Sequence, residues 1–112
     1  MSDDDICDVT ITADDADWLA GFVRSLVEDR LAACGNITTA PVRSVYRWEG
    51  TIEDALEAQV VLHTRRSLVP EIVQRTDREH PDDVPQVLAV PVVAANPAYH
   101  RWVLAETREP TG

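Results

Sequence analysis

The spacing of apolar residues predicts most of the secondary structure of this chain. Residues 6–12 (ICDVTIT) favour a strand. A helix of about five turns is predicted over 16–33, because apolar residues recur there at three- and four-residue intervals. Asp14 and Asp15 offer an N-cap and a favourable charge at its start. The apolar residues of this helix are Leu19, Phe22, Val23, Leu26, Val27 and Leu31.

The segment from Arg30 to Gly50 carries the densest set of signals. Residues 31–34 (LAAC) are predicted to close the first helix, and Gly35 to supply the left-handed residue that ends it. A strand is predicted over 37–48, since residues 42–48 (VRSVYRW) alternate at period two. Glu49-Gly50 then predicts a hairpin turn.

The strand predicted over 52–64 has two unlike faces. One face is apolar enough for a core, whereas the other is half polar and suits solvent or a subunit contact. The first face carries Leu56, Ala58, Val60 and Leu62, and the second carries Glu57, Gln59, Val61 and His63.

A second helix and two shorter elements complete the chain. Ser67 is predicted to cap this helix, with Pro70 in its first turn, Leu68, Ile72 and Val73 facing inward, and His80-Pro81 at its end. Val87 to Val93 predicts a strand that Pro91 confines to an edge or a bulge. Asn96-Pro97 begins a last short helix. This order predicts an α+β, ferredoxin-like βαββαβ fold with an extra C-terminal helix and an antiparallel sheet covered on one face, whose apolar open face favours oligomerisation.

Composition narrows the classes of function. The 112 residues predict a single domain, with a flexible acidic start at 1–5 and a flexible tail at 109–112. A net charge of −10 argues against nucleic acid as a partner. The absence of Lys beside 20 acidic residues favours a halophilic protein over GC-rich codon bias alone. No membrane span or signal peptide is visible, which predicts a cytoplasmic location.

Few side chains are candidates for metal binding, ligand binding or catalysis. His80, at a predicted helix end, is the best candidate metal ligand, with Asp82 and Asp83 as nearby oxygen donors, but hydrogen bonding to the last helix carbonyls is the competing interpretation. Tyr46 and Trp48 share a strand face and either pack or line a cleft. No nucleophile–base pair or phosphate loop is visible, so we do not expect an enzyme.

Two further groups have ordinary interpretations. Cys7 and Cys34 do not form a metal-binding spacing, and we expect both to be small buried residues. The run Asp3-Asp4-Asp5 is interpreted as a solvated terminus rather than as a site for a hard cation.

Several motifs together resemble the CutA divalent-cation-tolerance family. They are LAAC at 31–34, Tyr46-x-Trp48-Glu49-Gly50, Glu57-x-Gln59, His80-Pro81-x-x-x-Pro85, Leu88-x-Val90-Pro91-Val92 and Tyr99-x-x-Trp102. The resemblance implies a ferredoxin-like subunit in a tight homotrimer, architecturally similar to the PII signalling proteins. The hairpin around Glu49-Gly50 and the C-terminal segment would link subunits, and Tyr46, Trp48, Glu57 and His63 would lie at an intersubunit cleft.

The chain departs from the copper site credited to some bacterial members of that family. Ile11 stands at the position of the Cys ligand, and Glu79-His80 replaces a His pair. A carboxylate beside an imidazole predicts weak binding of copper or zinc at His80 and Glu79, with Cys34 as the remaining soft donor. We therefore expect a non-enzymatic trimer in divalent-metal response that acts with a protein partner. The alternative is a PII-like ligand-sensing or scaffold module.

Overall fold

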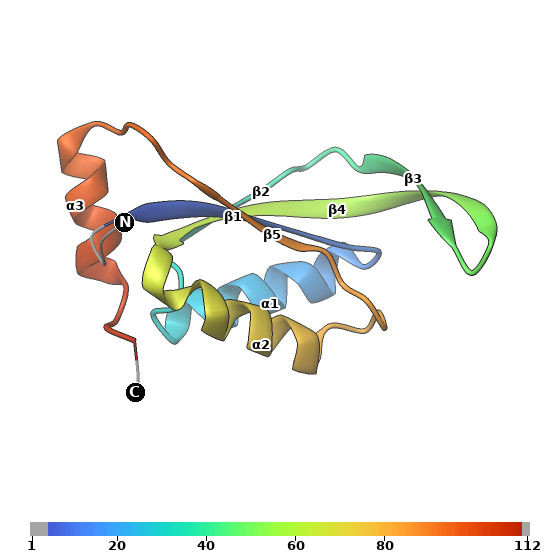
Figure 1. Ribbon diagram of the computed structural model, residues 1–112, viewed down its shortest axis with the longest axis horizontal. Coiled ribbons are helices and arrows are strands. Elements are labelled where there is room, and N and C mark those ends of the chain that lie inside the picture. Colours follow the sequence, from blue (N-terminus) through green and yellow to red (C-terminus); the bar gives the residue numbers. More distant parts are fainter. Residues whose placement is uncertain (1–4, 111–112) are drawn as a thin grey trace.

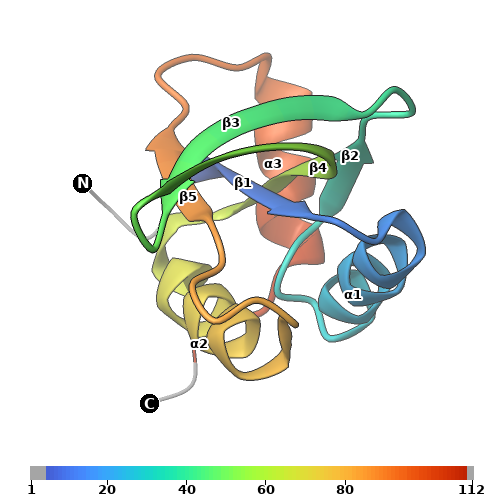
Figure 2. The same cartoon turned by 90° about the vertical axis from the view of Figure 1, so that its right-hand side faces the viewer.

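A five-stranded sheet organises the computed structural model, which describes residues 5–110 (Figure 1). The strand order is β2-β4-β1-β5, and β3 extends the sheet as a hairpin with β4. Helices α1 and α2 cover one face, and α3 stands at the end opposite the hairpin (Figures 1 and 2). The elements are β1 (Ile6–Ala13), α1 (Ala16–Glu28), β2 (Cys34–Ile37), β3 (Val42–Trp48), β4 (Thr51–Arg65), a 3₁₀ turn (Arg66–Leu68), α2 (Val69–Glu79), β5 (Val87–Pro91) and α3 (Pro97–Glu106).

This architecture confirms the predicted α+β, ferredoxin-like order with an added C-terminal helix. The strand pairings of the described chain are antiparallel, and β5 lies at an edge of the sheet. Pro91 is tolerated there because no described strand lies on the outer side of β5 to need its missing N–H group. Residues 1–4 and 111–112, which include most of the predicted flexible ends and of the Asp3-Asp4-Asp5 run, lie outside the described residues.

The core lies between the sheet and the two helices. Alternate residues of β1 and β4 face α1 and α2 and are fully buried, because strand side chains change face at every residue. The central members of this core are Val9, Ile11, Leu19, Leu26, Val60, Leu62, Leu68 and Ile72.

The predicted end of the first helix is wrong by about one turn. Helix α1 ends at Glu28, and Arg30 adopts the left-handed conformation with φ 61°. The Leu31 N–H donates to the Leu26 carbonyl at 2.9 Å and the Arg30 N–H to the Val27 carbonyl at 3.0 Å, which is the Schellman pattern. Leu31 therefore completes the helical apolar spacing from just outside the helix, and Cys34 already belongs to β2.

Gly35 allows β2 to approach α1 closely rather than ending the helix. A Cβ atom at this position would lie 2.5 Å from Cγ1 of Val23 and 3.2 Å from methyl groups of Val60 and Leu62. The glycine thus marks a backbone contact between strand and helix.

Gly35→Ala should therefore destabilise the fold by about 1–3 kcal/mol, the usual range for overpacking a core. Gly21→Ala is the matched control, since nothing lies within 4 Å of its added Cβ on the exposed side of α1. That control should stabilise by about 0.5–1 kcal/mol through helix propensity. Urea unfolding of both variants tests this; equal effects would refute the close-contact explanation.

The predicted strand over 37–48 is divided by residues 38–41, which end in Pro41, into β2 and β3. The hairpin turn is confirmed: Glu49 and Gly50 both have positive φ, 49° and 80°, as a type I′ turn requires. The β3–β4 hairpin projects beyond the helices (Figure 1). Leu56, predicted to face the core, is consequently 61% exposed.

Helix α2 also begins differently from the prediction. Its N-cap is Leu68, without a side-chain cap, and the buried Ser67 Oγ has no hydrogen-bond partner within the described chain. Its predicted end at His80 is confirmed, since His80 has an extended backbone before Pro81.

Candidate functional site

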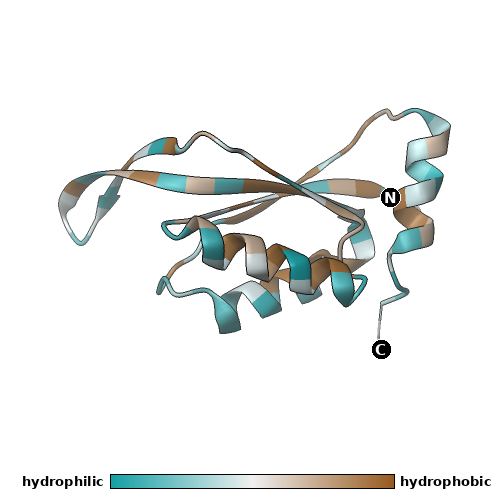
Figure 3. Ribbon diagram, turned by 180° about the vertical axis from the view of Figure 1, so that it is seen from behind, coloured by the Kyte–Doolittle hydropathy of each residue, from teal (hydrophilic) through white to brown (hydrophobic). Residues whose placement is uncertain are grey.

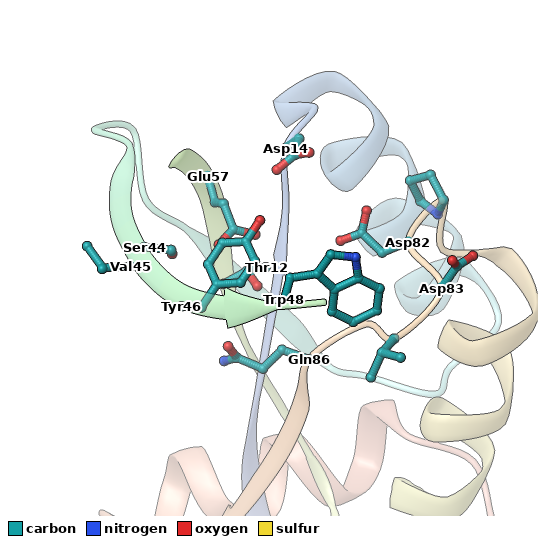
Figure 4. A pocket seen from close by; sticks show the side chains of 12 residues that line it. Thr12, Asp14, Ser44, Val45, Tyr46, Trp48, Glu57, Asp82, Asp83 and Gln86 are labelled. Atoms are coloured by element: carbon teal, nitrogen blue, oxygen red, sulfur yellow. The ribbon is translucent and has the colours of Figure 1, made fainter. Parts of the chain in front are cut away.

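A cleft of about 640 Å³ lies between the β3–β4 hairpin and the segment that joins α2 to β5 (Figure 4). The hairpin contributes two aromatic rings, and four of the other lining residues are acidic. The side chains that define its chemistry are Tyr46, Trp48, Asp14, Glu57, Asp82 and Asp83.

Strand pairing explains why the hairpin residues meet there. Val42 pairs with Glu57 and Tyr46 with Glu53, so the even residues of β3 and the odd residues of β4 share one face. Tyr46 is 45% exposed and Trp48 39% exposed, which leaves both rings accessible to a ligand or a neighbouring subunit. Tyr46, Trp48 and Glu57, for which the family resemblance implies an intersubunit cleft, line this cleft within a single subunit (Figure 4).

The electrostatic field of the cleft is negative. Partial burial, followed by the charges of Glu53, Asp14, Glu57 and Asp82, raises the pKa of the Tyr46 hydroxyl. The phenol therefore stays protonated at neutral pH and can donate a hydrogen bond. The same carboxylates that disfavour a phenolate favour a bound cation.

His80 lies behind the cleft wall. Its side chain is fully buried, and Nε2 lies 2.8 Å from the Thr12 carbonyl oxygen, to which it must donate. The Asp82 N–H donates to Nδ1 at 3.0 Å, so the ring is neutral and both nitrogens are engaged. His80 thereby joins the 81–86 segment to β1 and positions Asp82 in the cleft.

Glu79 also has protein partners. Its Oε2 accepts from Arg75 Nε at 2.5 Å, and Arg75 in turn contacts Asp29 at 2.7 Å. The two predicted metal ligands, Glu79 and His80, therefore bond to different neighbours and do not converge on a common metal position. Within residues 5–110, no three His, Cys, Asp or Glu side chains converge closely enough to hold a metal ion.

Cys34 and His63 lie at a different part of the sheet. His63 pairs with Cys34, six residues along β4 from Glu57, a separation of roughly 20 Å at 3.3 Å per residue. His63 therefore shares a face with Glu57 but does not reach the cleft.

Comparison with known proteins shows the family. The family model described as CutA1 divalent ion tolerance protein matches residues 7–106. The chain belongs to the CutA1 divalent ion tolerance family. This family is named for divalent-ion tolerance rather than for a reaction.

CutA relatives cover much of this chain. It is 35% identical over 112 residues to the divalent-cation tolerance protein CutA of Pectobacterium atrosepticum, a match that covers 96% of this chain and 100% of that protein. It is 41% identical over 82 residues to the mouse protein CutA, covering 73% of this chain and 46% of that protein. The chain spans about half the length of this and other eukaryotic relatives. The crystal structure of CutA1 from Oryza sativa matches with a TM-score of 0.90 at 31% identity, covering 95% of this chain and 96% of that one.

Sequence reasoning missed several cleft residues, of which Asp14 and Thr12 are examples. Asp14 was interpreted only as a possible helix cap, and Thr12 as a strand residue. Asp15 is the actual N-cap, accepting from Asp17 and Trp18 N–H groups, which leaves Asp14 to face the cleft. The pairing of β1 with β4, in which Thr12 lies opposite Gln59, brings this end of β1 to the base of the hairpin. None of the helices in residues 5–110 is both long and apolar enough to cross a membrane.

Proposed function

We propose that this CutA protein is a homotrimer that contributes to divalent-cation tolerance by binding ions such as zinc or copper(II) weakly in the acidic cleft. The observation that carries this proposal is that four carboxylates, Asp14, Glu57, Asp82 and Asp83, line the same cleft as Tyr46. Carboxylate oxygens bind divalent cations, and a cleft without thiolate should do so only at micromolar or weaker affinity.

A second subunit would add metal ligands to those that one subunit provides. No three His, Cys, Asp or Glu side chains converge within the described part of the chain, so water or groups from a second subunit would complete a coordination shell. Large apolar side chains are exposed on the hairpin and along β5, and hydrophobic segments are visible on the projecting hairpin (Figure 3). Patches of this kind mark subunit interfaces. The exposed apolar side chains are Val45, Ile52 and Leu56 on the hairpin and Leu88 and Val90 on β5.

Calorimetric titration with zinc tests this function. We expect micromolar or weaker binding that Glu57→Gln or Asp82→Asn weakens tenfold or more. Asp77→Asn is the control, because Asp77 is exposed on α2 and does not line the cleft. Unchanged binding in both cleft variants would overturn the assignment. Loss of binding only in His80→Gln would instead support His80 as the metal ligand.

A small-ligand sensor of the PII type is the second candidate. The cleft volume lies within the usual range for small-molecule sites, and two accessible aromatic rings could stack on an organic ligand. The surrounding carboxylates favour a cationic one. If metal titration gives no binding heat and organic cations raise the melting temperature, this alternative is favoured.

We further propose a cytoplasmic, non-catalytic role exerted through a protein partner. The charge of −10 supports a partner other than nucleic acid. The family's name, which refers to tolerance, supports binding rather than catalysis.

Stability should rise with salt. Three subunits would together carry about −30, three times the −10 of one chain. The Debye length falls from ~10 Å at 0.1 M to ~3 Å at 1 M, so repulsion between carboxylates is screened. We expect the melting temperature to rise from about 0.1 to about 2 M potassium chloride. A flat or falling curve would favour codon bias over halophilic adaptation.

A further inference from the structure

Three chemically active side chains form one row on the face of the sheet opposite α1 and α2. Cys34 of β2 lies directly opposite His63 of β4, and His63 lies directly opposite Asp8 of β1. Directly opposed residues have Cβ atoms about 5 Å apart and share a face. Sheet register alone therefore places a thiol, an imidazole and a carboxylate side by side.

The contacts within the row orient the imidazole. Asn36 Nδ2 lies 3.0 Å from His63 Nε2, and because the amide nitrogen can only donate, Nε2 is the acceptor. The proton of the neutral ring therefore sits on Nδ1, which lies 3.7 Å from Asp8 Oδ1. A carboxylate behind an imidazole is the usual arrangement around metal-ligating histidines.

The thiol lies on the other side of the same amide group. Cys34 Sγ donates to Asn36 Oδ1 at 3.4 Å, so one carboxamide contacts both the sulfur and the nitrogen. The Tyr99 ring packs edge-on against His63, with centroids 5.7 Å apart. The His63 side chain keeps 21% exposure, and Cys34 is half-buried, whereas Cys7 is buried.

We propose that Cys34 and His63 bind one soft monovalent cation, such as copper(I) or silver(I), between Sγ and Nε2. The Asn36 side chain rotates away, Cys34 releases its thiol proton to solvent, and the thiolate neutralises the ion. Soft d¹⁰ ions select sulfur and imidazole donors and accept two-coordinate geometry, so a third ligand is not required. The site lies roughly 20 Å along β4 from Glu57 and goes beyond the divalent-cation function proposed for the cleft.

Silver(I) is the probe, since it needs no reductant. Titration in chloride-free buffer, with methionine as a competing ligand, should give one bound ion per wild-type subunit. Cys34→Ser should abolish this binding, and His63→Gln should weaken it at least tenfold. Asp8→Asn should weaken it by about 10- to 100-fold, the range for a carboxylate that supports a metal-bound histidine.

The controls separate this site from the other thiol and from the cleft. Cys7→Ser and Glu57→Gln should bind silver as the wild type does, so this inference and the cleft proposal can fail independently. Asn36→Ala should bind silver at least as tightly as the wild type, because the Asn36 carboxamide no longer has to be displaced. The ¹⁵N resonance of His63 Nε2 should shift on binding. Binding that survives Cys34→Ser, or is unaffected by His63→Gln, would overturn the proposal.

Discussion

Arg65→Ala should lower the free energy of unfolding by about 3 kcal/mol or more, the cost of removing one partner from a buried charged network. Its side chain is only 8% exposed and ends at the C-terminus of α3. Arg65 Nε donates to Thr107 Oγ1 at 3.0 Å, and Nη2 donates to the Leu104 carbonyl at 2.6 Å. A cation here satisfies carbonyls that helix geometry leaves unpaired.

The expected fall in melting temperature is roughly 12–24 °C, from about 4–8 °C per kcal/mol in a domain of this size. Arg66→Ala is the matched control, because Arg66 is adjacent and exposed, and should change stability by less than about 0.5 kcal/mol. Both should be measured at one protein concentration, since association shifts apparent stability. Similar effects for the two variants would show that Arg65 does not anchor α3.

The double variant Val45→Asp/Leu56→Asp should dissociate the proposed trimer into monomers. These two side chains share the outer face of the hairpin and are 64% and 61% exposed in the single subunit. If a neighbouring subunit covers them, two buried carboxylates would cost several kcal/mol per interface. Because the positions are exposed in the subunit, the fold itself should survive.

Light scattering at high salt measures this directly. The wild type should give about three times the 12.4 kDa chain mass, and the double variant about one chain mass with an unchanged circular dichroism spectrum. Ala20→Asp/Gln74→Asp adds the same two carboxylates at exposed helix positions and should remain trimeric. A monomeric wild type, or a trimeric double variant, would contradict the proposed interface.

Periodicity predicted the faces of strands well, but not how far along a strand a contact lies. Glu57 and His63 do share the half-polar face of β4, yet only Glu57 reaches the cleft. Leu56 follows the core-facing alternation but lies in the part of β4 that pairs only with β3, beyond the end of β1. The strand face on which a residue lies follows from its place in the local sequence. Whether that residue is covered depends on where the neighbouring elements end.

Local signals also misplaced the end of α1 for a physical reason. Leu31 fits the helical apolar spacing because, in the Schellman turn, it packs back toward the preceding helix from outside it. Arg30 occupies the left-handed position that the sequence suggested for Gly35. Gly35 is needed instead because a side chain there would clash with Val23. The row of Cys34, His63 and Asp8 depends on register between three strands, which no local pattern specifies.

Anomalous diffraction from zinc-soaked crystals is the most direct test of cation binding in the cleft. The proposed function predicts a peak beside Glu57 and Asp82, close to the Tyr46 hydroxyl, with at least one ligand from a neighbouring subunit. No peak in the cleft of a well-diffracting soaked crystal, or peaks confined to His80 or to Cys34 and His63, would contradict it.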